Sequence, residues 1–217
     1  MPGKPGGSQS WSGGLSDAQL IDRELGRNPE LRSGVSAYSE LLRAYQKSGD
    51  KRQLSVGILD HAARQYRKGG VPRAKFVTFN DGAADFLFDL THERTILVWG
   101  LSRTVAPGTR DKKYHAGFSA AGKKGEKLEK GHAWAHAPGG REGGPNYFPQ
   151  ARRLNQEVSE NGHLWREIEK YLAANAGLSA FIRLIYAAGN EGFRPNEVEY
   201  GILPASGQFR AVIFPNS

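Results

Sequence analysis

Apolar and polar positions follow two different periods along the chain, and the change falls near residue 70. Before that point, apolar side chains recur three or four positions apart, as in Leu54, Ile58 and Ala62, which is the spacing of one helix face. The pair Gly69-Gly70 ends this pattern as a helix C-cap would. We therefore predict that residues 15–70 form a helical segment.

After residue 70 the pattern is typical of strands. The runs KFVTFN and ADFLFDL flank an Asp81-Gly82 turn signal, and the continuous apolar run TILVWGL follows them. A helical face recurs from Leu164 to Leu172, and the chain closes with FIRLIY, EVEYGIL and QFRAVIF. Strands in series with local turns predict an α+β protein with an antiparallel sheet.

Composition narrows the class of protein. The chain has 217 residues, 38% of them hydrophobic and none of them cysteine, so disulfides and thiolate metal sites are excluded. No apolar run reaches the roughly 20 residues that span a bilayer, and the N-terminus lacks the apolar core of a signal peptide. Residues 1–14 are rich in Gly, Pro and Ser, which predicts a flexible tail. We expect a soluble protein with no membrane partner, delivered without a cleavable signal peptide if it is secreted or enters a target cell.

The net charge of +8 favours polyanionic partners, and its distribution is uneven. Residues 101–132 hold eight basic and three acidic side chains, a net charge of +5, and we predict a long irregular loop over residues 102–131. The lysines expected to contact nucleic acid are Lys112, Lys113, Lys123, Lys124, Lys127 and Lys130.

The stretch GHAWAHAPGGREGGPNYFPQARRLNQ, residues 131–156, follows this segment and carries two histidines and several glycines. A zinc protease is disfavoured, because Ala133 stands where the glutamate after the first histidine is required. For His136 a hydrogen bond within a loop is the expected role. Taken alone, His132 would receive the same interpretation.

The order of residues in this region resembles the DNA/RNA non-specific endonuclease family, the ββα-metal (His-Me finger) nucleases that also occur as domains of bacterial polymorphic toxins. The resemblance covers approximately residues 71–217. It rests on Glu129-Lys130-Gly131-His132, Gly139-Gly140, Asn146-Tyr147-Phe148-Pro149-Gln150, Leu154-Asn155, and Trp165 with Glu169.

The resemblance implies a role for each matching residue. His132 would be the general base, Asn155 the protein ligand of Mg²⁺ or another divalent cation, and Glu169 would orient metal-bound waters. An arginine would stabilise charge on the phosphate, with Arg103 the first candidate and Arg110 the second. Asn146 and Gln150 are expected to support the loop.

The function implied is a metal-dependent, non-specific endonuclease for DNA, with RNA as a second substrate, deployed as an antibacterial toxin with an immunity protein or a secretion carrier as partner. Glu129-Lys130 replaces the family's Asp-Arg, which supports an alternative, a non-catalytic nucleic-acid-binding protein on the nuclease scaffold. A third interpretation makes residues 15–70 an interaction module. The predicted organisation is a tail at 1–14, a helical segment at 15–70 and a ββα-metal nuclease domain at 71–217.

Overall fold

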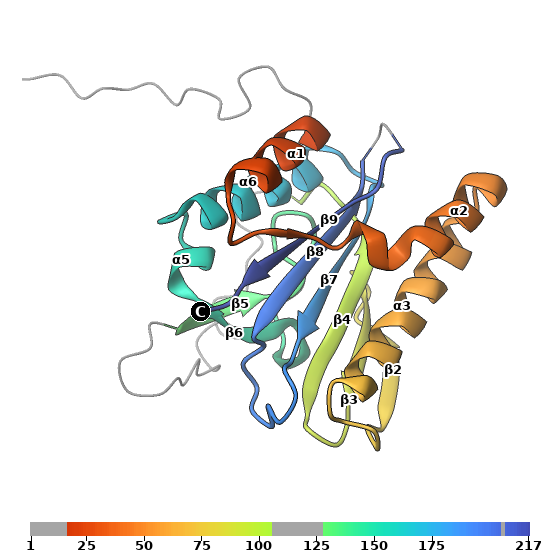
Figure 1. Ribbon diagram of the computed structural model, residues 1–217, viewed down its shortest axis with the longest axis vertical. Coiled ribbons are helices and arrows are strands. Elements are labelled where there is room, and N and C mark those ends of the chain that lie inside the picture. Colours follow the sequence, from red (N-terminus) through yellow and green to blue (C-terminus); the bar gives the residue numbers. More distant parts are fainter. Residues whose placement is uncertain (1–16, 106–127, 205–206) are drawn as a thin grey trace, which may run out of the picture.

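The computed structural model describes residues 17–105, 128–204 and 207–217 (Figure 1). A seven-stranded sheet in the order β1-β9-β8-β7-β4-β3-β2 forms its centre, and β5 and β6 form a separate hairpin. Every neighbouring pair of strands is antiparallel. The α+β class with an antiparallel sheet, predicted from the sequence, is confirmed.

Apart from β1, the strands of the seven-stranded sheet lie where the alternating and continuous apolar runs predicted them. Their bounds are β1 Arg32–Ser33, β2 Phe76–Asn80, β3 Asp85–Asp89, β4 Arg94–Leu101, β7 Ser179–Ile185, β8 Glu197–Leu203 and β9 Arg210–Pro215. Strand β1 was not predicted, because two residues are too few to show a period. The Asp81-Gly82 turn joins β2 and β3, and Gly82 has a φ of 86°, a conformation that favours glycine.

The helices form two groups. Their bounds are α1 Asp17–Arg27, α2 Ser39–Ser48, α3 Lys51–Lys68, α5 Arg152–Asn155 and α6 Glu160–Ala174, with short 3₁₀ turns η1 Val35–Tyr38 and η2 Gly144–Asn146. None of the helices in the described ranges is long and apolar enough to cross a bilayer.

Helices α2 and α3 cover one face of the sheet, and α1 and α6 cover the opposite face (Figure 1). The ring of Tyr38, in η1, packs edge-on against Phe181 at 5.4 Å, on the same side as α3. The indole of Trp165, in α6, packs against Tyr200 at 4.9 Å. Phe181 pairs with Gly201, and successive residues of a strand face opposite sides, so Tyr200 faces away from α3.

The predicted helical segment is largely confirmed, and it packs directly on the sheet. Leu20, Ile21, Tyr38 and Ile58 belong to the same buried cluster as the strands. The Tyr38 hydroxyl donates to Glu199 Oε2 at 2.7 Å, and Arg183 Nε donates to the same oxygen at 2.6 Å. The division of the chain at residue 70 stays a prediction, and the tail at 1–14 lies outside the described residues.

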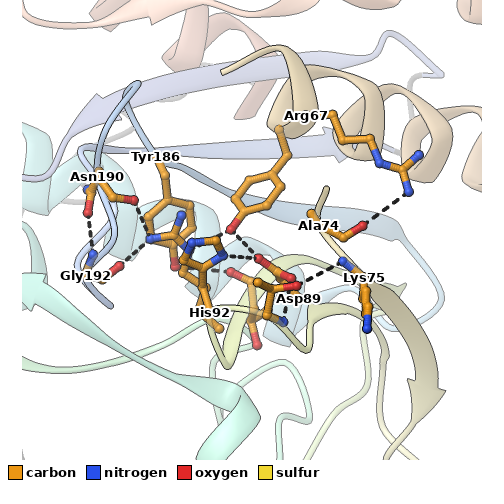
Figure 2. A network of polar contacts seen from close by, with 12 residues as sticks. Arg67, Ala74, Lys75, Asp89, His92, Tyr186, Asn190 and Gly192 are labelled. Atoms are coloured by element: carbon orange, nitrogen blue, oxygen red, sulfur yellow. Dashed lines mark hydrogen bonds and ion pairs between the residues drawn. The ribbon is translucent and has the colours of Figure 1, made fainter. Parts of the chain in front are cut away.

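A second buried polar network ties the end of α3 to the β3–β4 connection (Figure 2). Asp89 Oδ2 accepts from the Tyr66 hydroxyl at 2.7 Å and lies 2.7 Å from His92 Nδ1. Arg94 Nε donates to the Tyr66 hydroxyl at 2.8 Å. These contacts give His92 a structural partner in its turn.

One expectation near the hairpin needs correction. Residues 128–131, predicted as part of the basic loop, belong to strand β5. The helical face predicted from Leu164 to Leu172 lies in α6, which Ser159 caps by accepting from Gly162 N at 3.1 Å through its Oγ.

Candidate active site

A strand, a glycine-containing loop, a second strand and a helix follow one another between residues 128 and 155. Strand β5, Leu128–His132, pairs with β6, Tyr147–Ala151, and α5 begins at the next residue. Gly131 lies against Gln150, so closely that a Cβ at this position would collide with the Gln150 side chain. Strands β5 and β6 and helix α5 thus form one ββα unit that holds the motif residues from Glu129 to Asn155.

His132 is the last residue of β5, and a carboxylate holds its ring. The imidazole Nε2 lies 3.1 Å from Glu142 Oε2, and the two side chains are 10% and 5% exposed. The Tyr147 hydroxyl donates to the same carboxylate oxygen, and its ring packs edge-on against the imidazole at 5.0 Å. The imidazole therefore has a fixed orientation with an acid at one nitrogen.

The loop between His132 and Glu142 is folded by its own amides and glycines. The Asn146 side chain accepts from Trp134 N at 2.6 Å and donates to the carbonyls of Trp134 at 2.9 Å and Arg141 at 2.7 Å. Gly140 passes so close to the Trp134 carbonyl that no Cβ would fit. Asn146 thus has the loop-supporting role predicted for it, and the loop returns Glu142 to His132.

His136 lies within this loop. Its Nδ1 is 3.2 Å from the Gly140 carbonyl oxygen, which is the loop hydrogen bond predicted from the sequence.

Asn155 ends α5, next to Glu129 of β5. Its Nδ2 donates to Glu129 Oε2 at 2.9 Å, and the other Glu129 oxygen lies 3.5 Å from Arg152 Nε. Because the amide nitrogen is engaged, the Oδ1 atom on the other side of the amide is directed away from Glu129. An amide oxygen beside a carboxylate is a donor set that suits a hard divalent cation with several waters, such as Mg²⁺.

The described ranges contain no group of three or more His, Asp or Glu side chains that could enclose a metal. A cation at Asn155 would therefore rely on water and substrate oxygens for most of its coordination. Mg²⁺ accepts such coordination, whereas a structural zinc site requires about four protein ligands.

Glu169 lies in α6, the helix that packs against α5. It is 5% exposed, and its oxygens accept from Trp165 Nε1 at 2.9 Å and Arg166 at 2.8 Å. Burial raises the pKa of this carboxyl, against the opposing effect of Arg166. Arg166 also reaches the Asn155 carbonyl at 3.5 Å, so Arg166 links Glu169 to Asn155. The water-orienting role of Glu169 stays a prediction.

Arg103 lies next to Pro138 and Gly139 of the loop between His132 and Glu142. Its Nη1 donates to the Gly82 carbonyl at 2.7 Å, and its backbone N–H donates to the Pro138 carbonyl at 2.9 Å. These contacts put Arg103 beside the loop that carries Glu142. Its role at the phosphate stays a prediction.

Of the basic side chains predicted to contact nucleic acid or phosphate beyond Arg103, Lys130 lies within the described residues. Lys130 Nζ is 4.8 Å from the centre of the Tyr147 ring. The others, Arg110, Lys112, Lys113, Lys123, Lys124 and Lys127, lie outside the described residues.

Three side chains at the site were not assigned from the sequence. Glu142 holds His132, Glu129 holds Asn155, and Arg152 lies beside Glu129. A signal for Glu142 was present, because it is the lone acid in residues 131–156. Tyr147 adds a hydrogen bond to Glu142.

No family model and no curated protein matches this chain. Among solved structures, it is similar to the structure of Sda1 nuclease with bound zinc ion, at 11% identity and a TM-score of 0.42. The match covers 70% of this chain and 86% of that one. This likeness is too distant to assign any residue, so the roles proposed below rest on the contacts of the chain itself.

Proposed function

We propose that this protein is a metal-dependent, sequence-nonspecific endonuclease that hydrolyses phosphodiester bonds of DNA, with RNA as a second substrate. One observation supports it most strongly. The ββα unit holds a histidine against a carboxylate at the end of β5, and an amide against a second carboxylate at the end of α5. A protein that only binds nucleic acid has no need of either pair.

His132 would act as the base. A proton on Nε2, facing Glu142, would make Nδ1 the nitrogen that takes a proton from water. The hydroxide oxygen then bonds to phosphorus, the bond from phosphorus to the 3′ oxygen breaks, and this oxygen takes a proton from solvent. The products are a 5′-phosphate and a 3′-hydroxyl. The Glu142 carboxylate stabilises the imidazolium that His132 becomes.

Asn155 would hold the divalent cation through Oδ1, with Glu129 fixing the amide. Bound there, the cation would withdraw charge from the scissile phosphate and position its oxygens. Glu129 and His132 are three residues apart on β5, which is about 10 Å of strand. Glu129 and His132 thus lie on the same strand, one in each pair.

Sequence preference should be slight, because the basic side chains engage phosphates and phosphate contacts carry no base information. The net charge of +8 supports binding of a polyanion. Use as an antibacterial toxin, with an immunity protein or carrier as partner, rests on the family resemblance alone.

Purified protein incubated with plasmid DNA and with RNA tests the proposal. Cleavage should require Mg²⁺ and stop when EDTA is added. The products in Mg²⁺ should form no discrete bands, because the cleavage sites are not sequence-specific. Tight binding with no cleavage in any divalent cation would favour the non-catalytic nucleic-acid-binding protein instead.

A further inference from the structure

A hollow of about 430 Å³ lies between the N-terminal end of α3 and the sheet. It is separate from the ββα unit and is lined by the helical segment on one side and by β4 on the other. The lining residues that matter here are Lys51, Arg52, Trp99, Leu101 and Arg103. The part of this lining that belongs to residues 15–70 lies outside the resemblance to nucleases.

The rim of the hollow is cationic. Lys51, Arg52 and Arg103 are exposed, and the carboxylate among the described lining residues is Asp85. Asp85 Oδ1 already accepts from Asn80 Nδ2 at 2.8 Å. The rim therefore favours an anion.

The N-terminus of α3 adds to the positive potential of the rim, but its backbone N–H groups are not the groups that would bind the phosphate. The Asp50 side chain already caps α3, accepting from the backbone N–H groups of Arg52 and Gln53. The side chains of Lys51 and Arg52 remain as the groups that can grip a phosphate.

The interior is apolar and aromatic. Trp99 lines it and is only partly buried, and Leu101 at the end of β4 is 50% exposed. A planar apolar surface beside positive charges is the combination that stacks a nucleobase while its phosphate pairs with a cation. The volume falls within the range of small-ligand sites and suits about one nucleotide.

The hollow also adjoins the proposed active site. The guanidinium of Arg103 donates to the Gly82 carbonyl, and the backbone of Arg103 is bonded to Pro138. A Cβ at Gly82 would lie 3.0 Å from the Arg141 guanidinium, and Arg141 directly precedes Glu142. One loop thus borders both the hollow and the His132–Glu142 pair.

We propose that this hollow binds one nucleotide of the substrate strand, beyond the scissile phosphate. The base lies against Trp99 and Leu101, and the phosphate pairs with Lys51 and Arg52. This inference rests on the proposed nuclease function for its account of the substrate. It gives the helical segment a direct part in nucleic-acid binding.

The test is the binding of fluorescent single-stranded oligonucleotides, measured by anisotropy with Mg²⁺ in the His132→Ala background so that no cleavage interferes. Lys51→Glu/Arg52→Glu should weaken binding of a thymidine 12-mer about tenfold or more. Binding of a thymidine dinucleotide should weaken much less, because a dinucleotide cannot reach both the active site and the hollow. The matched control, Arg64→Glu/Lys68→Glu, reverses two exposed charges near the other end of α3 and should change binding of the 12-mer less than about threefold.

Acids at the N-terminal end of a helix stabilise it, so the test variant should fold, as circular dichroism would check. Trp99→Leu should also weaken binding of the 12-mer, and Trp99→Phe should retain most of it because a ring still stacks. Equal binding by the Lys51→Glu/Arg52→Glu variant and the control would overturn the inference.

The proposed nuclease function fails separately. If the protein without the His132 substitution cleaves nothing while the Lys51→Glu/Arg52→Glu variant still loses affinity, the nuclease proposal is wrong and the nucleotide site stands. If the protein cleaves and the variant binds as the control does, only the nucleotide site is wrong.

Discussion

The Asn155 amide donates to the Glu129 carboxylate at 2.9 Å across 26 residues of sequence, joining the end of α5 to strand β5. This bond determines which end of the amide is free for a cation. The longer acid at position 129, in place of the family's aspartate, therefore still has a partner at the site.

Removing the Glu129 carboxylate should loosen metal binding. Glu129→Ala leaves the Asn155 amide free to rotate, and we expect the Mg²⁺ concentration for half-maximal cleavage to rise by about 10- to 100-fold, the usual effect of losing a residue that orients a metal ligand. Titration of cleavage with Mg²⁺ measures it. An unchanged Mg²⁺ requirement would show that Glu129 does not orient the ligand.

A charge exchange tests the same pair from the other side. Asn155→Asp places a second carboxylate against Glu129, so it should impair activity although a carboxylate can ligate Mg²⁺. Adding Glu129→Gln restores a carboxylate–amide pair and should recover activity relative to Asn155→Asp alone. No recovery in the double variant would argue that the two side chains act independently.

Glu142→Gln should slow turnover without loss of nucleic-acid binding. A positioned general base contributes about 10²- to 10⁴-fold in total, and we expect loss of its orienting carboxylate to remove at least about tenfold of this. Unchanged turnover by a folded Glu142→Gln variant would show that Glu142 does not orient the base.

Stability should fall as the pH falls through the range in which His61 becomes protonated. Burial, with the charges of Arg183, Arg64 and Lys68, lowers the pKa of His61 from 6.5 to about 4. Between pH 6.5 and 4, His61 is protonated in the unfolded chain but remains neutral in the folded chain. The free energy of unfolding therefore decreases as the pH is lowered. Urea unfolding at several pH values should show a shallower decrease for His61→Gln. The same slope for both proteins would contradict this origin.

Gly34 should be essential for the contact between the helical segment and the sheet. A Cβ at this position would collide with the buried Glu199 carboxylate, which Tyr38 and Arg183 hold in place. Gly34→Ala should destabilise the fold by about 1–3 kcal/mol, the usual cost of overpacking.

Gly26→Ala is the matched control for that substitution. Gly26 lies in helix α1, where a Cβ added to it would have nothing within 4 Å, so alanine there should be neutral or stabilise the fold by up to about 1 kcal/mol. Thermal unfolding compares the two. Equal stability of both variants would show that the Glu199 side chain moves to make room for the added Cβ.

Local patterns were sufficient to predict the larger strands and helices. The spacing of Leu164, Trp165, Ile168 and Leu172 identified the buried face of α6, and all four side chains are buried. The N-terminus of α6 was not predicted, because the Ser159 cap lies within a polar run that apolar spacing does not register. Strand β1 was missed because its pairing with β9 is set by distant residues.

The candidate site divides in the same way. His132 and Asn155 were assigned from an ordered motif, whereas Glu142 and Glu129 could be identified as their partners only from the folded loop and hairpin. A carboxylate ten residues from a histidine has no periodic relation to it. Only the turn built by Gly140 and Asn146 brings the two together.

The rate of DNA cleavage by the folded His132→Ala variant in Mg²⁺, compared with the unsubstituted protein and with both in EDTA, tests the nuclease proposal most directly. We expect cleavage by the unsubstituted protein only in Mg²⁺, a rate about 10²- to 10⁴-fold lower for His132→Ala, and nearly equal binding of DNA by the two proteins. A His132→Ala variant that cleaves as fast as the unsubstituted protein, or cleavage that persists in EDTA, would contradict the proposed roles of His132 and Asn155.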